Sequence, residues 1–359
     1  MTKGSMEPAF HPSLSPVQAE KNLATLLVRG PIHYSALNRA IERLEVRFRN
    51  YCAFYSHGLW APGLVITGEM RGSTEQYLPM AEIRSAFRHF FSATLRYPLS
   101  DESSPFQAAT NWLDLLQRLR LSQDSVNPAI LLKKLVTDEP ERIRFLFTTL
   151  LPHHHGGCFL RYPEQLHHLE GWLRRRINHL SEEVRVLDAA CGTGEGTYDL
   201  AGLLLKCGIP PRRQQIHGSS LEPLEVFTAA HGSFPHDPER QKHFRTSVEP
   251  LYTAQATGNM LFFRDNIMRY PAQAEKPYDI ILCNGILGGP FLHAPEMIEN
   301  SIAALAKRLK SGGIILAADK FHGGWKKENP PARVVEITQR IGLEVHHGEY
   351  GIAANKKAV

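Results

Sequence analysis

The sequence predicts an α/β protein in which a mainly helical N-terminal domain precedes a doubly wound parallel sheet. Before residue 150, apolar side chains recur at steps of three and four, which indicates helices. From about residue 156, short apolar runs alternate with helical segments, the pattern of a parallel sheet that binds ligands at the carboxyl ends of its strands. A chain of 359 residues is too long for one typical core. We therefore expect two domains, residues 1–155 and 156–359.

Composition favours an ordinary globular protein, with 43% hydrophobic and 21% charged residues. No apolar run approaches the roughly 18 residues that span a bilayer, and the N-terminus lacks the apolar core of a signal peptide. We expect a cytoplasmic protein whose partners include neither membrane nor nucleic acid, since the net charge of +5 is spread over both halves. Five scattered cysteines and a histidine run at 153–155 without nearby acidic ligands predict neither disulfides nor a metal site.

The N-terminal domain is predicted to consist mainly of successive helices. The first opens at Ser15-Pro16, because proline suits the first helical turn, and the next covers 35–54. The stretch 58–73 is rich in glycine and proline with one short β-branched run, so a loop or small hairpin is expected there. Three further helices are expected at 80–96, 106–120 and 140–151. Their apolar stripes predict a helical core and no chemistry.

The C-terminal domain is predicted to begin with a helix at 162–180 that has Pro163 near its start. Apolar and β-branched runs predict strands at 184–189, 214–220, 260–265, 278–284 and 312–319, and a terminal hairpin at 343–354. Helical patterns lie between them at 196–208, 221–232 and 294–313.

The most informative stretch is VRVLDAACGTGEGTYDLA at 184–201, a strand, a glycine-rich turn and a helix. Such a turn can hold a dinucleotide or S-adenosylmethionine, or can be a tight turn without a ligand. A dinucleotide fingerprint requires Gly or Ala where this chain has Thr197. The pattern D-x-A-x-G-x-G at 188–194 instead resembles the first motif of class I S-adenosylmethionine-dependent methyltransferases. We expect side chains at Gly192 and Gly194 to collide with the methionyl chain of that cofactor.

Further stretches resemble, in order, the CheR family of chemoreceptor glutamate methyltransferases. The resemblance covers roughly 140–325 and is carried by GCFLRYPEQL at 157–166, CGTGEGTYDLAGLL at 191–204, GSSLEPLEVFTAAHG at 218–232, FFRDNI at 262–267, YDIILCNGIL at 278–287 and LAKRLKSGGIILAADKF at 305–321. It implies a Rossmann-like methyltransferase domain with S-adenosylmethionine as cofactor.

The resemblance also implies a set of cofactor-binding residues. Arg161 would bind the methionine carboxylate, Glu195 would lie near the ammonium group, and Asn266 and Ile267 would contact the adenine. The simpler alternatives are a surface ion pair for Arg161, a first-turn helix acid for Glu195 and a turn residue for Asn266. The full predicted set is Gly157, Arg161, Asp188, Ala190, Gly192, Gly194, Glu195, Ser220, Glu222, Asp265, Asn266, Ile267, Asn284 and Gly285.

Several positions depart from the family pattern. The aspartate that binds the ribose in the family falls on Ser220, and Glu222 occupies the place of a second aspartate two residues later. An Arg-Asn pair after the fourth strand becomes Asn284-Gly285, and a family threonine becomes Gly157. The span 232–266 is shorter than in the family, where a small β-subdomain there docks on receptor tails.

These features predict an enzyme that transfers a methyl group by direct displacement at a sulfonium. A small-molecule acceptor, methylated on oxygen or nitrogen, is expected, with the N-terminal domain as a lid or docking domain. His322, His293 and Tyr198 are candidate bases where the acceptor carries a proton. The alternatives are a CheR-type protein-glutamate O-methyltransferase, a non-catalytic S-adenosylmethionine-binding module and an NAD-dependent oxidoreductase.

Overall fold

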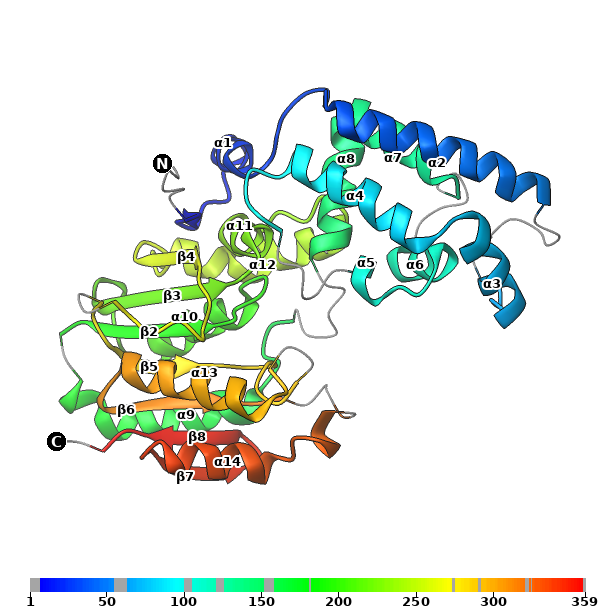
Figure 1. Cartoon of the computed structure of the whole chain (residues 1–359). Helices are drawn as coiled ribbons and strands as arrows, with labels where there is room; N and C mark the ends of the chain where they lie inside the picture. The colour runs from blue at the N-terminus through cyan, green and yellow to red at the C-terminus, as the bar shows by residue number, and fades with distance from the viewer. Residues whose placement is uncertain are drawn as a thin grey trace. The chain divides into compact units, whose positions relative to one another are not determined.

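A computed structural model describes residues 7–54, 63–99, 105–120, 126–151, 158–180, 182–272, 275–289, 292–319, 323 and 325–357 (Figure 1). The chain divides into a sheet unit, residues 1–19 with 154–359, and a helical unit, residues 20–153. The predicted boundary lies close to this division, but the first nineteen residues belong to the sheet unit. The reason is strand β1, Ala9–Phe10, which pairs antiparallel with β4, Met260–Arg264.

The sheet unit contains the predicted doubly wound sheet, with eight strands in the order β1-β4-β3-β2-β5-β6-β8-β7 (Figure 1). Its other strands are β2 (Val184–Ala189), β3 (Gln214–Ser220), β5 (Tyr278–Leu282), β6 (Leu309–Ala317), β7 (Glu344–Gly348) and β8 (Gly351–Asn355). Strands β4, β3, β2, β5 and β6 run parallel, and the predicted terminal hairpin is formed by β7 and β8. The carboxyl ends of the five parallel strands therefore meet at one edge of the sheet.

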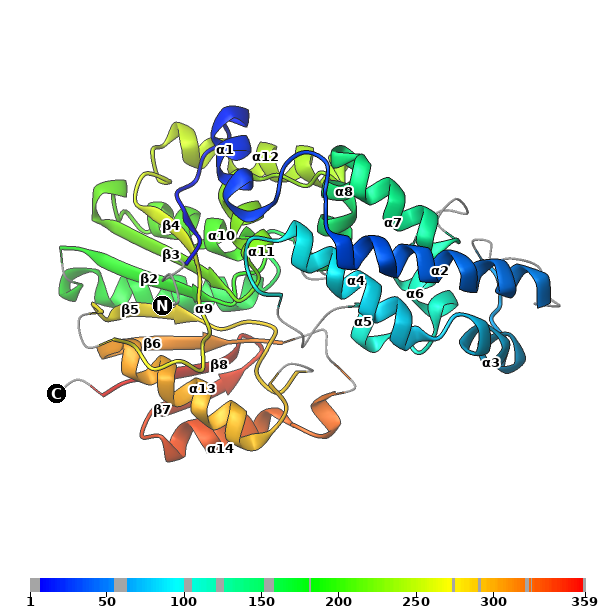
Figure 2. The ribbon, with the colours of Figure 1, turned by 45° about the horizontal axis from the view of Figure 1, so that its top comes forward.

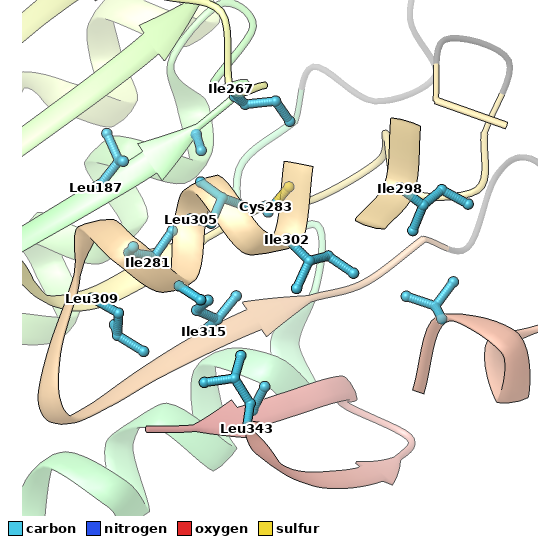
Figure 3. Packing of buried hydrophobic residues seen from close by; sticks show 14 of the residues in the cluster. Leu187, Ile267, Ile281, Cys283, Ile298, Ile302, Leu305, Leu309, Ile315 and Leu343 are labelled. Carbon is cyan, nitrogen blue, oxygen red and sulfur yellow. The ribbon is translucent and has the colours of Figure 1, made fainter. Parts of the chain in front are cut away.

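Helices cover both faces of this sheet (Figure 2). They are α9 (Pro163–Arg176), α10 (Glu195–Lys206), α11 (Pro223–His231), α12 (Pro238–Thr253), α13 (Pro295–Arg308) and α14 (Pro331–Arg340), with short 3-10 helices at Ile177–His179, Pro211–Arg213 and Trp325–Lys327. Leu187, Ile281 and Ile315 point to the face covered by α13, where Ile302 and Leu305 pack onto them (Figure 3). Helices α10 and α11 pack against β2, β3 and β4, so the core is buried on both faces.

The helical unit contains the predicted succession of helices. They are most of α1 (Pro16–Leu26), α2 (Ser35–Phe54), α3 (Gly68–Tyr77), α4 (Met80–Thr94), α5 (Pro105–Ala108), α6 (Trp112–Leu119), α7 (Pro128–Thr137) and α8 (Glu139–Leu150). The loop or hairpin expected at 58–73 is wrong in its second part. There the Thr67 side chain accepts a hydrogen bond from the Met70 N–H at 3.2 Å and caps α3, whose Met70 and Thr74 are buried.

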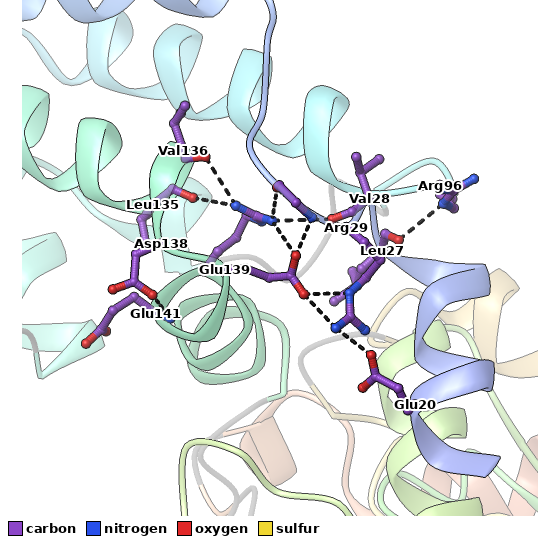
Figure 4. A network of polar contacts seen from close by, with 12 residues as sticks. Glu20, Leu27, Val28, Arg29, Arg96, Leu135, Val136, Asp138, Glu139 and Glu141 are labelled. Atoms are coloured by element: carbon purple, nitrogen blue, oxygen red, sulfur yellow. Dashed lines mark hydrogen bonds and ion pairs between the residues drawn. The ribbon is translucent and has the colours of Figure 1, made fainter. Parts of the chain in front are cut away.

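A buried ion network stabilises the helical unit (Figure 4). Arg142 in α8 is only 1% exposed and donates hydrogen bonds to the carbonyl oxygens of Leu135 at 3.0 Å and Gly30. Glu139 accepts from Arg29 Nε at 2.6 Å and from the Gly30 N–H. Burial opposes ionisation of Glu139, but these hydrogen bonds and the Arg29 charge leave its pKa below the usual value. The network joins the segment after α1 to α7 and α8.

A helix that crosses a bilayer must be both long and apolar. In the part of the chain that the structure describes, no helix combines the length and the apolar character needed to cross a membrane.

Candidate functional site

The predicted strand, glycine turn and helix lie at the carboxyl edge of the sheet. After β2, Ala190, Gly192 and Gly194 adopt left-handed backbone with φ of 67°, 55° and 93°. The Cys191 N–H donates to the Ser219 carbonyl at 2.8 Å, which fixes the turn against the end of β3. Helix α10 then begins at Glu195, so its N-terminus faces the edge where ligands bind in this class of fold.

The two glycines of this turn have different roles. A Cβ atom at Gly192 would have no heavy atom within 4 Å, so this position borders open space. A Cβ atom at Gly194 would lie 2.7 Å from the Ala229 Cβ and 3.3 Å from the Phe262 ring. The expected collision with the methionyl chain stays a prediction at both positions, and the structure adds a packing reason for glycine at 194. That glycine permits close packing of the turn on α11, whereas Gly192 remains the glycine that borders a possible ligand.

Arg161 reaches the carboxyl end of β5 from the segment before α9. Its Nη1 and Nη2 atoms lie 3.7 and 3.9 Å from the position that a Cβ of Gly285 would take. Gly285 has a φ of 78° and its N–H donates to the Ala318 carbonyl at 2.9 Å. The structure thus brings the predicted Arg161 and Gly285 together at the edge that also carries Gly192.

Asn284, the residue before Gly285, holds this edge together. Its Oδ1 accepts hydrogen bonds from Gln165 Nε2 at 3.0 Å and from the Ala318 N–H at 2.8 Å. Its Nδ2 donates to Gln165 Oε1 at 2.8 Å, and Gln165 is 1% exposed. This reciprocal amide pair joins α9 to the ends of β5 and β6. Asn284 therefore positions the backbone of the predicted site, and its partner Gln165 has no motif signal that the sequence interpretation used.

Two acidic residues flank the glycine turn. Asp188 is 5% exposed and accepts a hydrogen bond from Thr197 Oγ1 at 2.7 Å. Burial, with a contribution from the Glu195 charge, raises the pKa of Asp188 to about 6. Glu195 accepts from Thr193 Oγ1 at 2.6 Å and from Arg240 Nη2 at 2.8 Å. The residue that departs from the dinucleotide fingerprint, Thr197, thus serves as the hydrogen-bond donor to Asp188.

Sequence reasoning missed Arg240. It lies in the first turn of α12, 45 positions from its partner Glu195, and no local pattern connects the two. Its Nη2 atom also donates to Thr193 Oγ1 at 2.6 Å. The predicted role of Glu195 beside the cofactor ammonium stays a prediction, and the structure adds that this carboxylate already has a cationic partner.

The end of β3 carries a second polar group that the sequence interpretation only partly found. Ser220 donates a hydrogen bond from Oγ to a carboxylate oxygen of Glu225 in the first turn of α11. Glu222 is the N-cap of that helix, and its Oε1 accepts from the Leu224 N–H at 3.1 Å. Burial, with a contribution from the Glu195 charge, raises the pKa of Glu225 to about 7. Glu225 was missed because an acid in the first helical turn is common for dipole reasons alone.

The predicted adenine segment follows β4 next to Ser220. The Asp265 N–H donates to the Ser220 carbonyl at 3.0 Å, while the Asp265 carboxylate pairs with the Arg308 guanidinium. Asn266 is exposed, and its Oδ1 accepts from the Met268 N–H at 3.0 Å. Ile267 is 8% exposed and joins the core cluster (Figure 3). The segment lies at the expected edge, but the Asp265 carboxylate is already engaged within the protein.

Two of the three candidate bases, Tyr198 and His293, lie in the described part of the chain. Tyr198 is 1% exposed, and its hydroxyl donates to the Ala229 carbonyl at 2.9 Å. Burial raises the Tyr198 pKa well above its usual value, so a role as base is not supported. His293 is exposed just before α13. His322, like the predicted Gly157 and the histidine run 153–155, lies outside the described residues.

These residues fit S-adenosylmethionine. The cofactor carries a carboxylate, an ammonium and a sulfonium, so it requires one cationic and several anionic or polar partners. Arg161 supplies the cation at the end of β5, and Gly192 leaves open space beside the turn. The buried Asp188 and Glu225 have raised pKa values, and a nearby positive charge would favour their ionised forms.

Comparison with known proteins agrees with this geometry. Residues 157–320 match the family model described as CheR methyltransferase, SAM binding domain. The search of curated proteins found no match. A TehB-like SAM-dependent methyltransferase from Corynebacterium glutamicum is similar in structure, with 16% identity over 54% of this chain and 98% of that one and a TM-score of 0.31.

Two further solved structures show comparable similarity. Magnesium protoporphyrin IX methyltransferase from Synechocystis PCC 6803, solved with bound SAH, is 20% identical over 55% of this chain and 85% of that one, with a TM-score of 0.35. A sugar N-methyltransferase from Streptoalloteichus is 14% identical over 53% of this chain and 87% of that one, with a TM-score of 0.34. Residues 157–320 thus match the S-adenosylmethionine-binding domain of CheR methyltransferases, and this match supports S-adenosylmethionine-dependent methyltransferase activity.

Proposed function

We propose that this enzyme methylates an oxygen or nitrogen atom of a small molecule and does not methylate chemoreceptor glutamates. The observation that carries the proposal is the connection between α11 and β4. All residues from 232 to 259 are described, and they contain one helix, α12, with turns before and after it and no strand. In the CheR family this connection is expected to carry the β-subdomain that docks on receptor tails.

Helix α12 packs back onto its own domain. Phe244 is 1% exposed and its ring meets the Tyr198 ring edge-on, with centroids 5.6 Å apart. At the start of the helix, Arg240 forms its ion pair with Glu195 beside the glycine turn. The connection therefore supports the candidate site from within and replaces a segment that would bind a receptor.

The charge of the N-terminal region also favours a small acceptor. Residues 1–150 contain 17 lysines and arginines against 14 acidic residues, so they carry only a small positive excess. An acidic receptor helix would gain little electrostatic steering from such a surface. A small acceptor needs enclosure and positioning rather than long-range attraction.

Methyl transfer from a sulfonium requires mainly that the protein position the cofactor and the acceptor. When bound, the cofactor supplies a methyl group that its sulfonium makes electrophilic. The Gln165–Asn284 pair fixes the edge where Arg161 and Gly285 meet, and a fixed edge can position a bound cofactor. The half-buried His217 ring bonds with the Tyr278 hydroxyl, and the buried His231 ring bonds with the Ser13 carbonyl, each at 2.8 Å. Of the predicted bases, His293 is exposed to solvent, whereas Tyr198 is buried.

The test uses the full chain, methyl-labelled cofactor and two sets of acceptors. One set is a panel of receptor cytoplasmic fragments, and the other is a small-molecule metabolite extract. We expect the label in the small-molecule fraction and none on the fragments. Base-labile methyl esters formed on the fragments at a steady catalytic rate would overturn the proposal.

A His293→Gln variant, with His346→Gln on the exposed strand β7 as control, tests whether an imidazole takes part.

A further inference from the structure

We propose that Glu225 supplies the carboxylate that binds the ribose hydroxyls of S-adenosylmethionine, in place of the acid that is absent at position 220. This inference goes beyond the proposed function, because it concerns the cofactor and does not depend on the methyl acceptor.

Strand β3 ends in a serine where the resembling family has an aspartate. Ser220 is the last residue of this strand, and in the parallel register Asp188 of β2 lies opposite Gly218. Ser220 therefore lies at the same carboxyl edge as the glycine turn. Two adjacent hydroxyls are best matched by a carboxylate, which offers two acceptor oxygens, whereas a serine offers one.

The acid nearest to Ser220 in the sequence already has another role. Glu222 lies two residues beyond Ser220, but its carboxylate accepts the Leu224 N–H as the N-cap of α11. An N-cap side chain contributes about 1 kcal/mol to a helix. Turning Glu222 toward a ligand would therefore leave the first turn of α11 uncapped.

Glu225 itself lies beside Ser220. Its Oε2 accepts the Ser220 hydroxyl, so the carboxylate lies against the position where the strand-end acid would be. Within the described ranges of the chain, no other donor to this carboxylate is found, which leaves Oε1 for a ligand hydroxyl. Glu225 is 9% exposed, so a ligand bond formed there is largely shielded from water.

The electrostatic setting of Glu225 also bears on this role. The charged and titratable groups that act on Glu225 or on its neighbour Cys191 are Asp188 from β2, Glu195 from α10, Arg240 from α12 and Cys191 from the turn. Burial and the Glu195 charge raise the pKa of Glu225 to about 7, against the opposing effects of Ser220 and Arg240. Hydroxyl donors and a nearby sulfonium both favour the ionised carboxylate. Cofactor binding near neutral pH is therefore coupled to release of the Glu225 proton.

The experiment measures the affinity of S-adenosylhomocysteine and of its 2′-deoxy analogue by calorimetry at pH 8. We expect Glu225→Gln to weaken S-adenosylhomocysteine binding by about tenfold or more, the effect of losing a hydrogen bond to a charged group. The analogue lacks one of the two hydroxyls, so its binding should be weakened much less. The control Glu239→Gln, which alters an exposed acid in the first turn of α12, should stay within about twofold of the parent. The double variant Ser220→Asp with Glu225→Gln should recover most of the lost affinity.

A second readout uses the unaltered protein. Calorimetry at pH 7 in buffers of different ionisation enthalpy should show proton release on binding, and Glu225→Gln should abolish it. Unchanged affinity in Glu225→Gln, or an equal loss for both ligands, would overturn the inference. So would the absence of proton release from the parent, even if a variant failed to fold. None of these outcomes bears on which molecule accepts the methyl group.

Discussion

The two units each contain a buried polar cluster, and the clusters differ in how far their charges are balanced. In the helical unit, Arg142 donates to backbone carbonyls and Glu139 is bonded by Arg29 and Gly30 (Figure 4). Around the glycine turn, Arg240 pairs with Glu195, while burial raises the pKa values of Asp188 and Glu225. A balanced cluster stabilises its own fold, whereas an excess of buried acid is stabilised only by a ligand that brings positive charge or hydrogen-bond donors.

The largest effect is expected when the balanced cluster is broken. Arg142→Ala leaves the Leu135 and Gly30 carbonyls without their donor and removes the charge beside Glu139. We expect a loss of about 3–5 kcal/mol in the free energy of unfolding, measured by urea titration. The control is Arg144→Ala in the same helix, whose exposed ion pair with Glu141 should contribute no more than about 1 kcal/mol. Similar losses for both variants would show that the network is not structural.

The next effect distinguishes the two glycines of the turn. Gly194→Val places a branched side chain at a φ of 93° and into Ala229, so we expect about 2–4 kcal/mol of destabilisation. Gly192→Ala meets no neighbouring atom and should cost only about 1 kcal/mol, for its left-handed backbone. Thermal unfolding of the two variants checks the difference. Equal stability of the two variants would mean that Gly194 is required for the cofactor, as the motif predicts, and not for packing.

A smaller effect is expected on cofactor binding at the carboxyl end of β5. Arg161→Ala should weaken S-adenosylhomocysteine binding by roughly 1.5–3 kcal/mol, the range for a hydrogen bond to a charged group. The folded state should be little changed, which circular dichroism can confirm. Arg174→Ala in α9, where the arginine pairs with Glu170 on the surface, is the matched control. If the two variants bind equally well, the residue taken from the family motif is wrong at this position.

The smallest effect is a gain of stability at the unbalanced cluster. The folded pKa of Glu225 is about 7 and its ordinary value is 4.5, so the folded state holds the proton more tightly. Stability is therefore lost as the pH rises from about 4.5 to 7. Glu225→Gln should raise the free energy of unfolding of the unliganded protein by about 1–2 kcal/mol at pH 8 and leave it unchanged at pH 4. A loss at pH 8 would mean that the carboxylate is balanced after all.

The sequence predicts those parts of the molecule that depend on the pattern of neighbouring residues. The alternation of strands and helices and the motif from Asp188 to Gly194 predict the sheet and the turn before α10 correctly, whereas the cofactor-binding residues stay a prediction. What sequence missed depends on distant partners: Arg240 meets Glu195 only after α12 folds back. Likewise, the collision that demands glycine at 194 involves Ala229, on a different helix.

In one segment the local residue pattern predicts the wrong conformation. The glycine-rich and β-branched character of 58–73 favours a loop or hairpin, yet α3 begins at Gly68. The Thr67 cap and the burial of Met70 and Thr74 decide the conformation there. Burial of that kind is fixed by neighbouring helices and cannot be derived from the segment alone.

Strand β1 also determines the order in which the chain can be completed during synthesis. Phe10 pairs with Phe262 and packs edge-on against Phe227, yet more than half of the chain lies between these partners. The first strand leaves the ribosome long before β4 exists, and all the residues of the helical unit follow it. The N-terminal strand therefore cannot join the sheet until β4 has been synthesised. Its loss would expose β4 as an edge strand able to pair with other chains.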